Sequence, residues 1–262
     1  MILCADDYGL SDDINHAILD LCGARKLSAV SCMAVLERCT AKSLSELRKY
    51  EATLDLGLHF CLTDEGLPLT AMRAGTMPRI FPSFGNLFRR ALVGQVTARE
   101  IASQVSGQYD LFCDKCGRRP DYIDGHLHVH QLPGVREGVL DFVLGLPTDC
   151  RPYVRNTRLP LRRLLRNRLP WLKAASIGIF GVKMYKQLRE AGVPTNEGFA
   201  GIYDFREWPK YRGFLPRFAA CLSHPNGILV VHPAVNEKWR QQEFMTLREF
   251  SFPAGFPNRF RR

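Results

Sequence analysis

Short apolar stretches that end in a carboxylate or a histidine recur along this chain, and this recurrence limits the folds open to it. Several stretches have the length and composition of buried strands, at residues 1–5, 29–35, 54–63, 122–130, 151–155 and 228–232. Segments with apolar residues at helical spacing lie between them, for example at 41–50, 97–113 and 135–146. This alternation, without internal repeats, predicts an α/β fold with parallel strands.

The charge is concentrated in one part of the chain. The formal net charge is +10, yet residues 151–189 alone carry eleven Lys or Arg and no acidic residue. The rest of the chain is close to neutral. We therefore expect a single domain over residues 1–262 with a basic helical insertion at about 156–190.

The basic segment places apolar side chains beside its arginines. Leu161, Leu164 and Leu165 are spaced to share a helical stripe, and Trp171, Leu172 and 177–180 add an apolar patch. This combination predicts peripheral contact with an anionic membrane through 151–189, although a solvated helical insertion stays open. Binding of nucleic acid is not expected, because no RNA- or DNA-binding motif accompanies the charge.

The ends of the chain and its cysteines indicate a compartment. The first residues lack the positive region and the apolar region of a signal peptide, and no apolar run reaches the length of a membrane span. Nine cysteines are scattered, mostly in apolar surroundings. These features predict a cytoplasmic protein, with the inner membrane face as a second location through the basic segment.

Three predicted strand ends carry groups that bind metal ions. Asp6 and Asp7 follow the first strand, and His59 lies in the third. The strand predicted at 122–130 contains Asp124, His126, His128 and His130 at alternating positions, so these four side chains should share one face. Burying them together is costly unless a partner satisfies them, and a divalent cation would do so.

The chemistry of these groups suggests a hydrolase. An Asp/His/His set suits Zn²⁺ or a similar ion with a position left for water. Because consecutive side chains diverge, one aspartate of the Asp6–Asp7 pair can bind the ion while the other acts as a base. His232, at the end of the last strand, would suit a general acid or a structural role.

Four ordered motifs resemble the YdjC-like carbohydrate deacetylases, which include chitooligosaccharide deacetylases and members associated with hopanoid biosynthesis. The motifs are residues 5–11, 57–63, 120–130 and 232–234. The resemblance implies a distorted (β/α) barrel of the polysaccharide-deacetylase type. One departure is the start of the chain, which leaves a first strand of about four residues.

The resemblance also implies residue roles. Asp7, His59 and His126 would hold one divalent metal ion, Mg²⁺ or Zn²⁺. Asp6 would be the general base and His232 the general acid in removing an N-acetyl group from an amino sugar. His128, His130 and Arg155 would bind the substrate.

The substrate expected from the sequence is an N-acetylated amino sugar or glycoconjugate, on a lipid or another anionic carrier. A metal-dependent phosphoesterase is the alternative enzyme, and a basic nucleic-acid-binding protein is the alternative without catalysis. The sequence does not decide between a monomer and a homodimer.

Overall fold

The computed structural model describes residues 1–63, 81–159, 161–167, 172–222, 224–252 and 256–261. Its strands form one parallel sheet in the order β5-β4-β3-β2-β1-β7-β6. The strands are β1 Ile2–Tyr8, β2 Ala29–Cys32, β3 Asp55–Phe60, β4 Tyr122–Gly125, β5 Tyr153–Val154, β6 Phe199–Ala200 and β7 Ile228–Val231. The helices are α1 Asp12–Gly23, α2 Ala41–Arg48, α3 Phe84–Leu92, α4 Ala98–Cys116, α5 Val135–Gly145, α6 Leu161–Arg166, α7 Leu172–Glu190, α8 Tyr211–Ala220 and α9 Lys238–Glu249.

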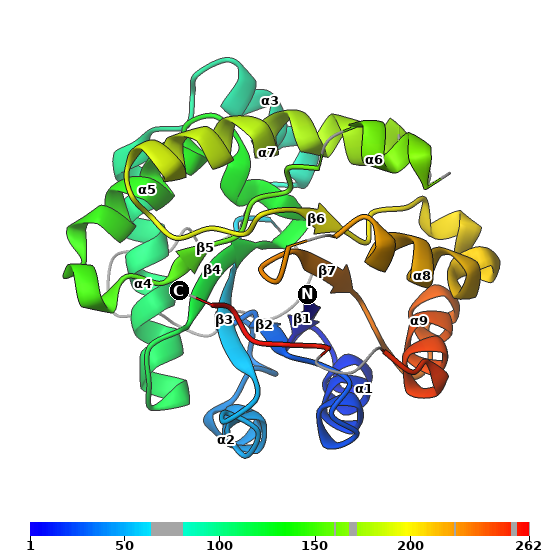
Figure 1. Cartoon of the computed structure of the whole chain (residues 1–262). Helices are drawn as coiled ribbons and strands as arrows, with labels where there is room; N and C mark the ends of the chain where they lie inside the picture. The colour runs from blue at the N-terminus through cyan, green and yellow to red at the C-terminus, as the bar shows by residue number, and fades with distance from the viewer. Residues whose placement is uncertain (64–80, 160, 168–171, 223, 253–255, 262) are drawn as a thin grey trace.

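The sheet curls into a half-barrel, and the helices surround it (Figure 1). Its edge strands approach each other through the residues that lead into β6. Val154 of β5 bridges to Thr195, and the Thr195 hydroxyl donates a 2.6 Å hydrogen bond to the Val154 carbonyl. The fold is therefore the distorted (β/α) barrel predicted from the sequence.

Alternating side chains on the strands build two apolar layers. Leu3 and Ala5 of β1 face the layer between the sheet and the helices, whereas Ile2 and Cys4 belong to a smaller cluster inside the curl. Tyr122 and Tyr153 stack in that inner cluster with their ring centroids 4.9 Å apart. Burial of both faces explains why these strands are apolar nearly throughout.

Helix starts follow from local capping chemistry. The Ser11 side chain accepts a hydrogen bond from the Ile14 amide at the start of α1, and Thr97 does the same for Glu100 at the start of α4. The sequence predicts Ser11 or Asp12 as the cap of the first of these helices and Thr97 as the cap of the second. The basic insertion forms α6 and α7 between β5 and β6. Among the helices of the described residues, we find none with the length and hydropathy needed to cross a bilayer.

Two strand predictions are wrong. The first strand has seven residues rather than about four, because Asp6, Asp7 and Tyr8 continue it. The strand predicted at 122–130 ends at Gly125, and a 3₁₀ helix follows over His126–Gln131. Residues 68–88 are rich in Pro, Gly and aromatic residues, a composition that predicts an irregular segment. Most of this segment lies outside the described residues, and its last part belongs to α3.

A close approach inside the curl makes Gly57 of β3 hard to replace. A Cβ there would lie 2.2 Å from the Tyr122 ring, which is fully buried and held by a 2.8 Å hydrogen bond between its hydroxyl and Ser31. We expect Gly57→Ala to lower the free energy of unfolding by about 1–3 kcal/mol. Urea denaturation measures this loss.

Gly213→Ala is the matched control, since a Cβ at this position in α8 meets nothing within 4 Å. It should leave stability unchanged or raise it by up to about 1 kcal/mol. Equal stability of the two variants would contradict the packing argument.

Candidate metal centre

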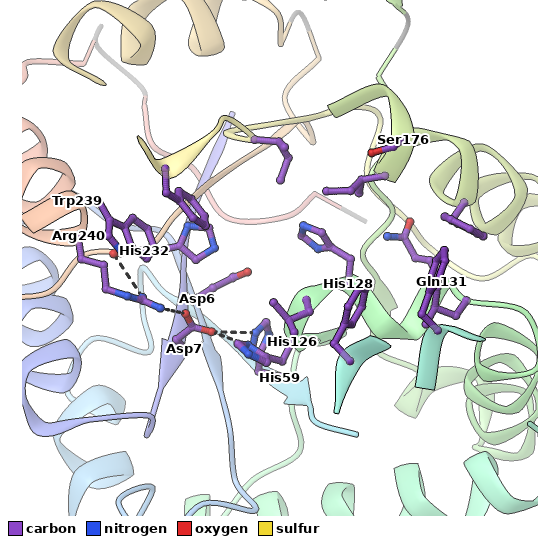
Figure 2. A pocket seen from close by; sticks show the side chains of 18 residues that line it. Asp6, Asp7, His59, His126, His128, Gln131, Ser176, His232, Trp239 and Arg240 are labelled. Carbon is purple, nitrogen blue, oxygen red and sulfur yellow. Dashed lines mark hydrogen bonds and ion pairs between the residues drawn. The ribbon is translucent and has the colours of Figure 1, made fainter. Parts of the chain in front are cut away.

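The carboxyl ends of β1, β3, β4 and β7 meet at the floor of one pocket of about 450 Å³. Parallel strands point their carboxyl ends to the same edge of a sheet, so residues distant in sequence converge there. Figure 2 shows the polar side chains on the floor. They are Asp6, Asp7, His59, His126, His128 and His232.

A distortion of β1 brings both aspartates into this pocket. The register between β1 and β2 shifts between Ala5 and Tyr8, and Asp7 has a positive φ of 72°. Such a conformation is strained for a residue with a side chain. In a regular strand the two carboxylates would point to opposite faces. The two side chains were expected to diverge, and they do contact different partners, Arg155 for Asp6 and Arg240 for Asp7. Both nevertheless line the same pocket.

Asp7, His59 and His126 form a buried cluster whose ligand atoms all lie within 4.8 Å of one another. The Asp7 Oδ1 atom is 2.9 Å from His126 Nδ1 and 3.4 Å from His59 Nε2 (Figure 2). One carboxylate and two imidazoles are a donor set suited to Zn²⁺ with an open position. These residues could hold a metal ion.

Asp124 orients His59 for this task. Its Oδ1 atom is 2.7 Å from His59 Nδ1, and its Oδ2 atom accepts a 2.6 Å hydrogen bond from the Ser31 hydroxyl. When a single ring proton is held between His59 Nδ1 and the carboxylate, the Nε2 atom keeps its lone pair on the side of Asp7, where it can bind a metal ion. Carboxylate–histidine pairs of this kind commonly support metal ligands.

The balance of charge also fits a cation. Three carboxylates, Asp6, Asp7 and Asp124, are buried here against two guanidinium groups, Arg155 and Arg240. Burial disfavours a charged His59, but the carboxylates of Asp124 and Asp6 outweigh it and raise the pKa of His59 to about 10. The floor thus favours one further positive charge, which a proton or a metal ion can supply.

Arg155 lies behind the floor rather than in it. It is fully buried and donates hydrogen bonds of 2.7 and 2.8 Å to the two oxygens of Asp6. Its Nη1 atom is also 2.9 Å from Asp124. Burial raises the pKa of Asp6, yet the charge and hydrogen bonds of Arg155, together with the charge of His59, outweigh burial and hold that pKa below its usual range. Arg155 therefore holds Asp6 in place and is not among the residues that line the pocket, and its contact with a substrate stays a prediction.

The turn after β4 separates three histidines that the sequence placed on one face. Positive φ angles at Leu127 and His128 end the strand direction, so His126 and His128 line the pocket while His130 does not. The His130 Nε2 atom contacts the Arg155 carbonyl at 2.8 Å, and burial lowers its pKa to about 4. His130 supports the backbone that carries Arg155.

His232 occupies the opposite side of the floor in an aromatic enclosure. Phe205 and Trp239 stack with centroids 3.9 Å apart, and each ring lies within 6 Å of the imidazole centroid. Burial, against the charges of Asp7 and Asp6, lowers the pKa of His232 to about 4. The imidazole is therefore neutral at pH 7.

Helix α9 supplies two supporting residues that the sequence did not reveal. Arg240 donates a 2.7 Å hydrogen bond to Asp7 Oδ2 and leaves Oδ1 facing the histidines. Glu243 accepts hydrogen bonds from the His232 amide and from the Tyr203 hydroxyl, and burial raises its pKa to about 7. In the sequence, Arg240 and Glu243 are three residues apart, about one helical turn, in a mostly polar helix. This spacing alone does not distinguish two buried charged residues from two exposed ones.

The walls above the floor are apolar. They come from α3, α7, the turn after β4 and the segments around β6 and α9. The apolar lining residues are Phe84, Phe88, Leu127, Leu132, Ile177, Phe180, Ile202, Phe205 and Trp239. Gln131 and Ser176 also line the pocket away from the floor, so the walls are mostly apolar and the titratable side chains gather at the floor.

Comparison with known proteins identifies the family. A sequence model of the YdjC-like proteins matches residues 1–254. The chain belongs to the YdjC-like family. This agrees with the four motifs from which the resemblance was inferred.

A solved structure supports the fold. A crystal structure from Enterococcus faecalis, provisionally described as a cellobiose-phosphate cleavage protein, is 17% identical, with a TM-score of 0.62 over 94% of this chain and 89% of that chain. A peptidoglycan deacetylase, PdaC from Bacillus subtilis, is 10% identical, with a TM-score of 0.39 over 94% and 80%.

Asp124→Asn tests the support of His59. We expect it to weaken Zn²⁺ binding by about 10- to 100-fold, because His59 loses the acceptor that fixes its ring. Competition with a chromophoric chelator measures the affinity, and thermal melting separates it from unfolding. Asp110→Asn, on the exposed face of α4, is the matched control. Equal affinities of the two variants would contradict the assignment.

The raised pKa of His59 predicts a pH dependence of the metal-free protein. Because the pKa is about 10 in the folded chain against an ordinary value of 6.5, protonated His59 stabilises the fold below pH 6.5. This stability should be lost as the pH rises from 6.5 toward 10. Urea midpoints in the presence of a chelator would measure it, and His59→Gln should flatten the decline. An unchanged decline in that variant would refute this origin.

Proposed function

We propose that this protein is a metal-dependent hydrolase that removes the N-acetyl group of an amino sugar and gives acetate and a free amine. One observation carries the proposal. A buried Asp7–His59–His126 cluster shares a pocket floor with a second carboxylate, Asp6, and with an enclosed imidazole, His232. Amide hydrolysis is helped by a Lewis acid that polarises the carbonyl, a base and a proton donor. The three-residue cluster could hold the Lewis acid, Asp6 could serve as the base, and His232 could serve as the proton donor.

Asp7, His59 and His126 would hold the ion. When bound, a divalent metal lowers the pKa of water and polarises a carbonyl oxygen. Two imidazoles and one carboxylate favour Zn²⁺ over Mg²⁺, since Mg²⁺ prefers oxygen ligands. Arg240 keeps one Asp7 oxygen turned toward the histidines.

Asp6 would accept the proton of the attacking water at a carboxylate oxygen. Its two hydrogen bonds to Arg155 fix its orientation and keep it ionised at neutral pH. The same bonds make Asp6 a weak base. Proton transfer to Asp6 is therefore favourable only from a water molecule whose pKa is itself lowered.

His232 would carry a proton to the departing amine. Because its pKa is about 4, it holds no proton at pH 7 and would have to take up the proton that Asp6 accepts from the attacking water before it donates it to the amine nitrogen. Phe205 and Trp239 pack beside the imidazole, which is half-buried. Glu243 holds its backbone amide in place.

The apolar walls favour a substrate that is more than a free sugar. The acetamido group would reach the floor while an apolar portion of the molecule contacts Phe84, Phe88 and Phe180. Aromatic rings also bind the apolar faces of sugars, so the walls fit a glycoconjugate on a lipid or another carrier.

A phosphoesterase with two metal ions is less favoured. A second group within the described residues, Cys4, Asp6 and Asp124, has metal-ligand spacing. Arg155 already contacts both of its carboxylates, and its guanidinium supplies the positive charge there. The geometry therefore supports one ion.

Paired variants test the proposal. Acetate release would be measured on a panel of N-acetylated sugars, free and lipid-linked, with and without chelator. We expect chelator to abolish release and Zn²⁺ or Mg²⁺ to restore it. Asp6→Asn should lower turnover by about 10²- to 10⁴-fold with metal still bound, whereas Asp7→Asn should lose both metal and activity.

Sugar phosphates are the alternative substrates in the same panel. Phosphate release without acetate release would replace the proposal with a phosphoesterase. Wild-type acetate release by both aspartate variants would refute the assigned roles.

A further inference from the structure

Two stretches without acidic residues lie far apart in the sequence. Residues 150–189 carry eleven basic residues, and residues 66–99 carry five arginines, with no Asp or Glu in either. Helix α7 belongs to the first stretch and α3 to the second. The sequence alone does not show that the two are related.

The fold brings the two stretches together at the pocket. The rings of Phe88 in α3 and Phe180 in α7 meet edge to face with centroids 6.0 Å apart, and the two helices lie side by side (Figure 1). Phe84 and Ser176 are exposed and also line the pocket. The outer faces of both helices therefore continue from the pocket mouth.

These outer faces expose large aliphatic side chains to solvent. In α7, Ile179 is 70% exposed and Val182 54%, while Leu92 and Val93 at the end of α3 are 54% and 59% exposed. Both helices also line the pocket, through Phe88 and Phe180, and several large aliphatic groups exposed on them favour an interaction surface over an ordinary solvated face. We call Ile179, Val182, Leu92 and Val93, with the basic residues between them, the α3–α7 rim.

Basic side chains are interleaved with the aliphatic ones. Lys183 and Lys186 follow Ile179 at helical spacing on the exposed side of α7, and Arg89 is exposed on α3. Lys186 is 3.8 Å from Glu190, an exposed pair that contributes little. Glu137 and Glu197 also contact the C-terminal half of α7, through Gln187 and Tyr185. Arg89, Lys183 and Lys186 place positive charge on the same helices as the exposed aliphatic groups.

We propose that the α3–α7 rim docks on the surface of an anionic bilayer. Aliphatic groups at the level of the headgroups and lysines facing lipid phosphates are the combination that interfacial helices use. Single-stranded nucleic acid prefers aromatic stacking platforms, which the exposed part of the rim lacks. Docking would place the pocket mouth at the membrane. The inference goes beyond the proposed function and does not depend on the reaction catalysed.

Vesicle co-sedimentation of the full chain tests it. Vesicles of phosphatidylcholine mixed with phosphatidylglycerol should bind the protein at low salt, and neutral phosphatidylcholine vesicles should bind it far less. High salt should weaken binding by screening the lysines. Lys183→Glu/Lys186→Glu should lower the partition coefficient more than about tenfold. Ile179→Ser/Val182→Ser should lower it as well, because the aliphatic contact is lost.

Lys42→Glu/Lys49→Glu is the matched control, with the same change of charge at exposed positions in α2 and directly after it. It should bind like the wild type, and none of these variants should change turnover of a small soluble substrate. Absence of binding to anionic vesicles at low salt would overturn the proposal. Equal loss in the control, or binding to RNA in place of vesicles, would do the same. Vesicle binding without acetate release would refute the proposed hydrolase and leave docking intact.

Discussion

Three buried carboxylates at one edge of the sheet impose the main constraint on this protein. Asp6, Asp7 and Asp124 have almost no contact with solvent, and buried charges destabilise a fold unless they are paired. Arg155 from the end of β5 spans Asp6 and Asp124, and Arg240 from α9 pairs with Asp7. The pairings tie the two sides of the half-barrel to its centre. They leave His59 and His126 facing one Asp7 oxygen, where a cation would complete the balance.

The floor also depends on backbone strain. Asp7, Leu127 and His128 have positive φ angles, and all three lie in or beside the pocket. Strain of this kind persists where surrounding contacts hold it, and it often marks functional sites. At Asp7 it turns two consecutive carboxylates to one pocket. At Leu127 and His128 it ends a strand early and directs only two of three histidines to the floor.

The pocket and its surroundings divide the work between different parts of the chain. The strand ends provide polar groups for chemistry, whereas α3 and α7 provide apolar walls and the basic rim. A hydrolase with this division would hold the reacting amide at the floor and the rest of a larger substrate between aromatic side chains. Under the proposed docking, the charge that the sequence concentrates in residues 151–189 would determine where the protein meets its substrate rather than how it reacts.

The sequence by itself determined the fold class, the parallel strands, the helix caps at Ser11 and Thr97, and the motif residues that converge at the strand ends. These follow from local periodicity and from the rule that parallel strands share a carboxyl edge. It could not predict the end of β4 at Gly125, the length of β1, or the supporting places of Arg155 and His130. The supporting roles of Arg240 and Glu243 could not be predicted, because the sequence of a mostly polar helix does not distinguish a buried charged residue from an exposed one. Only the tertiary structure decided these, since pairing of buried charges and the joining of α3 with α7 depend on contacts between residues far apart in the chain.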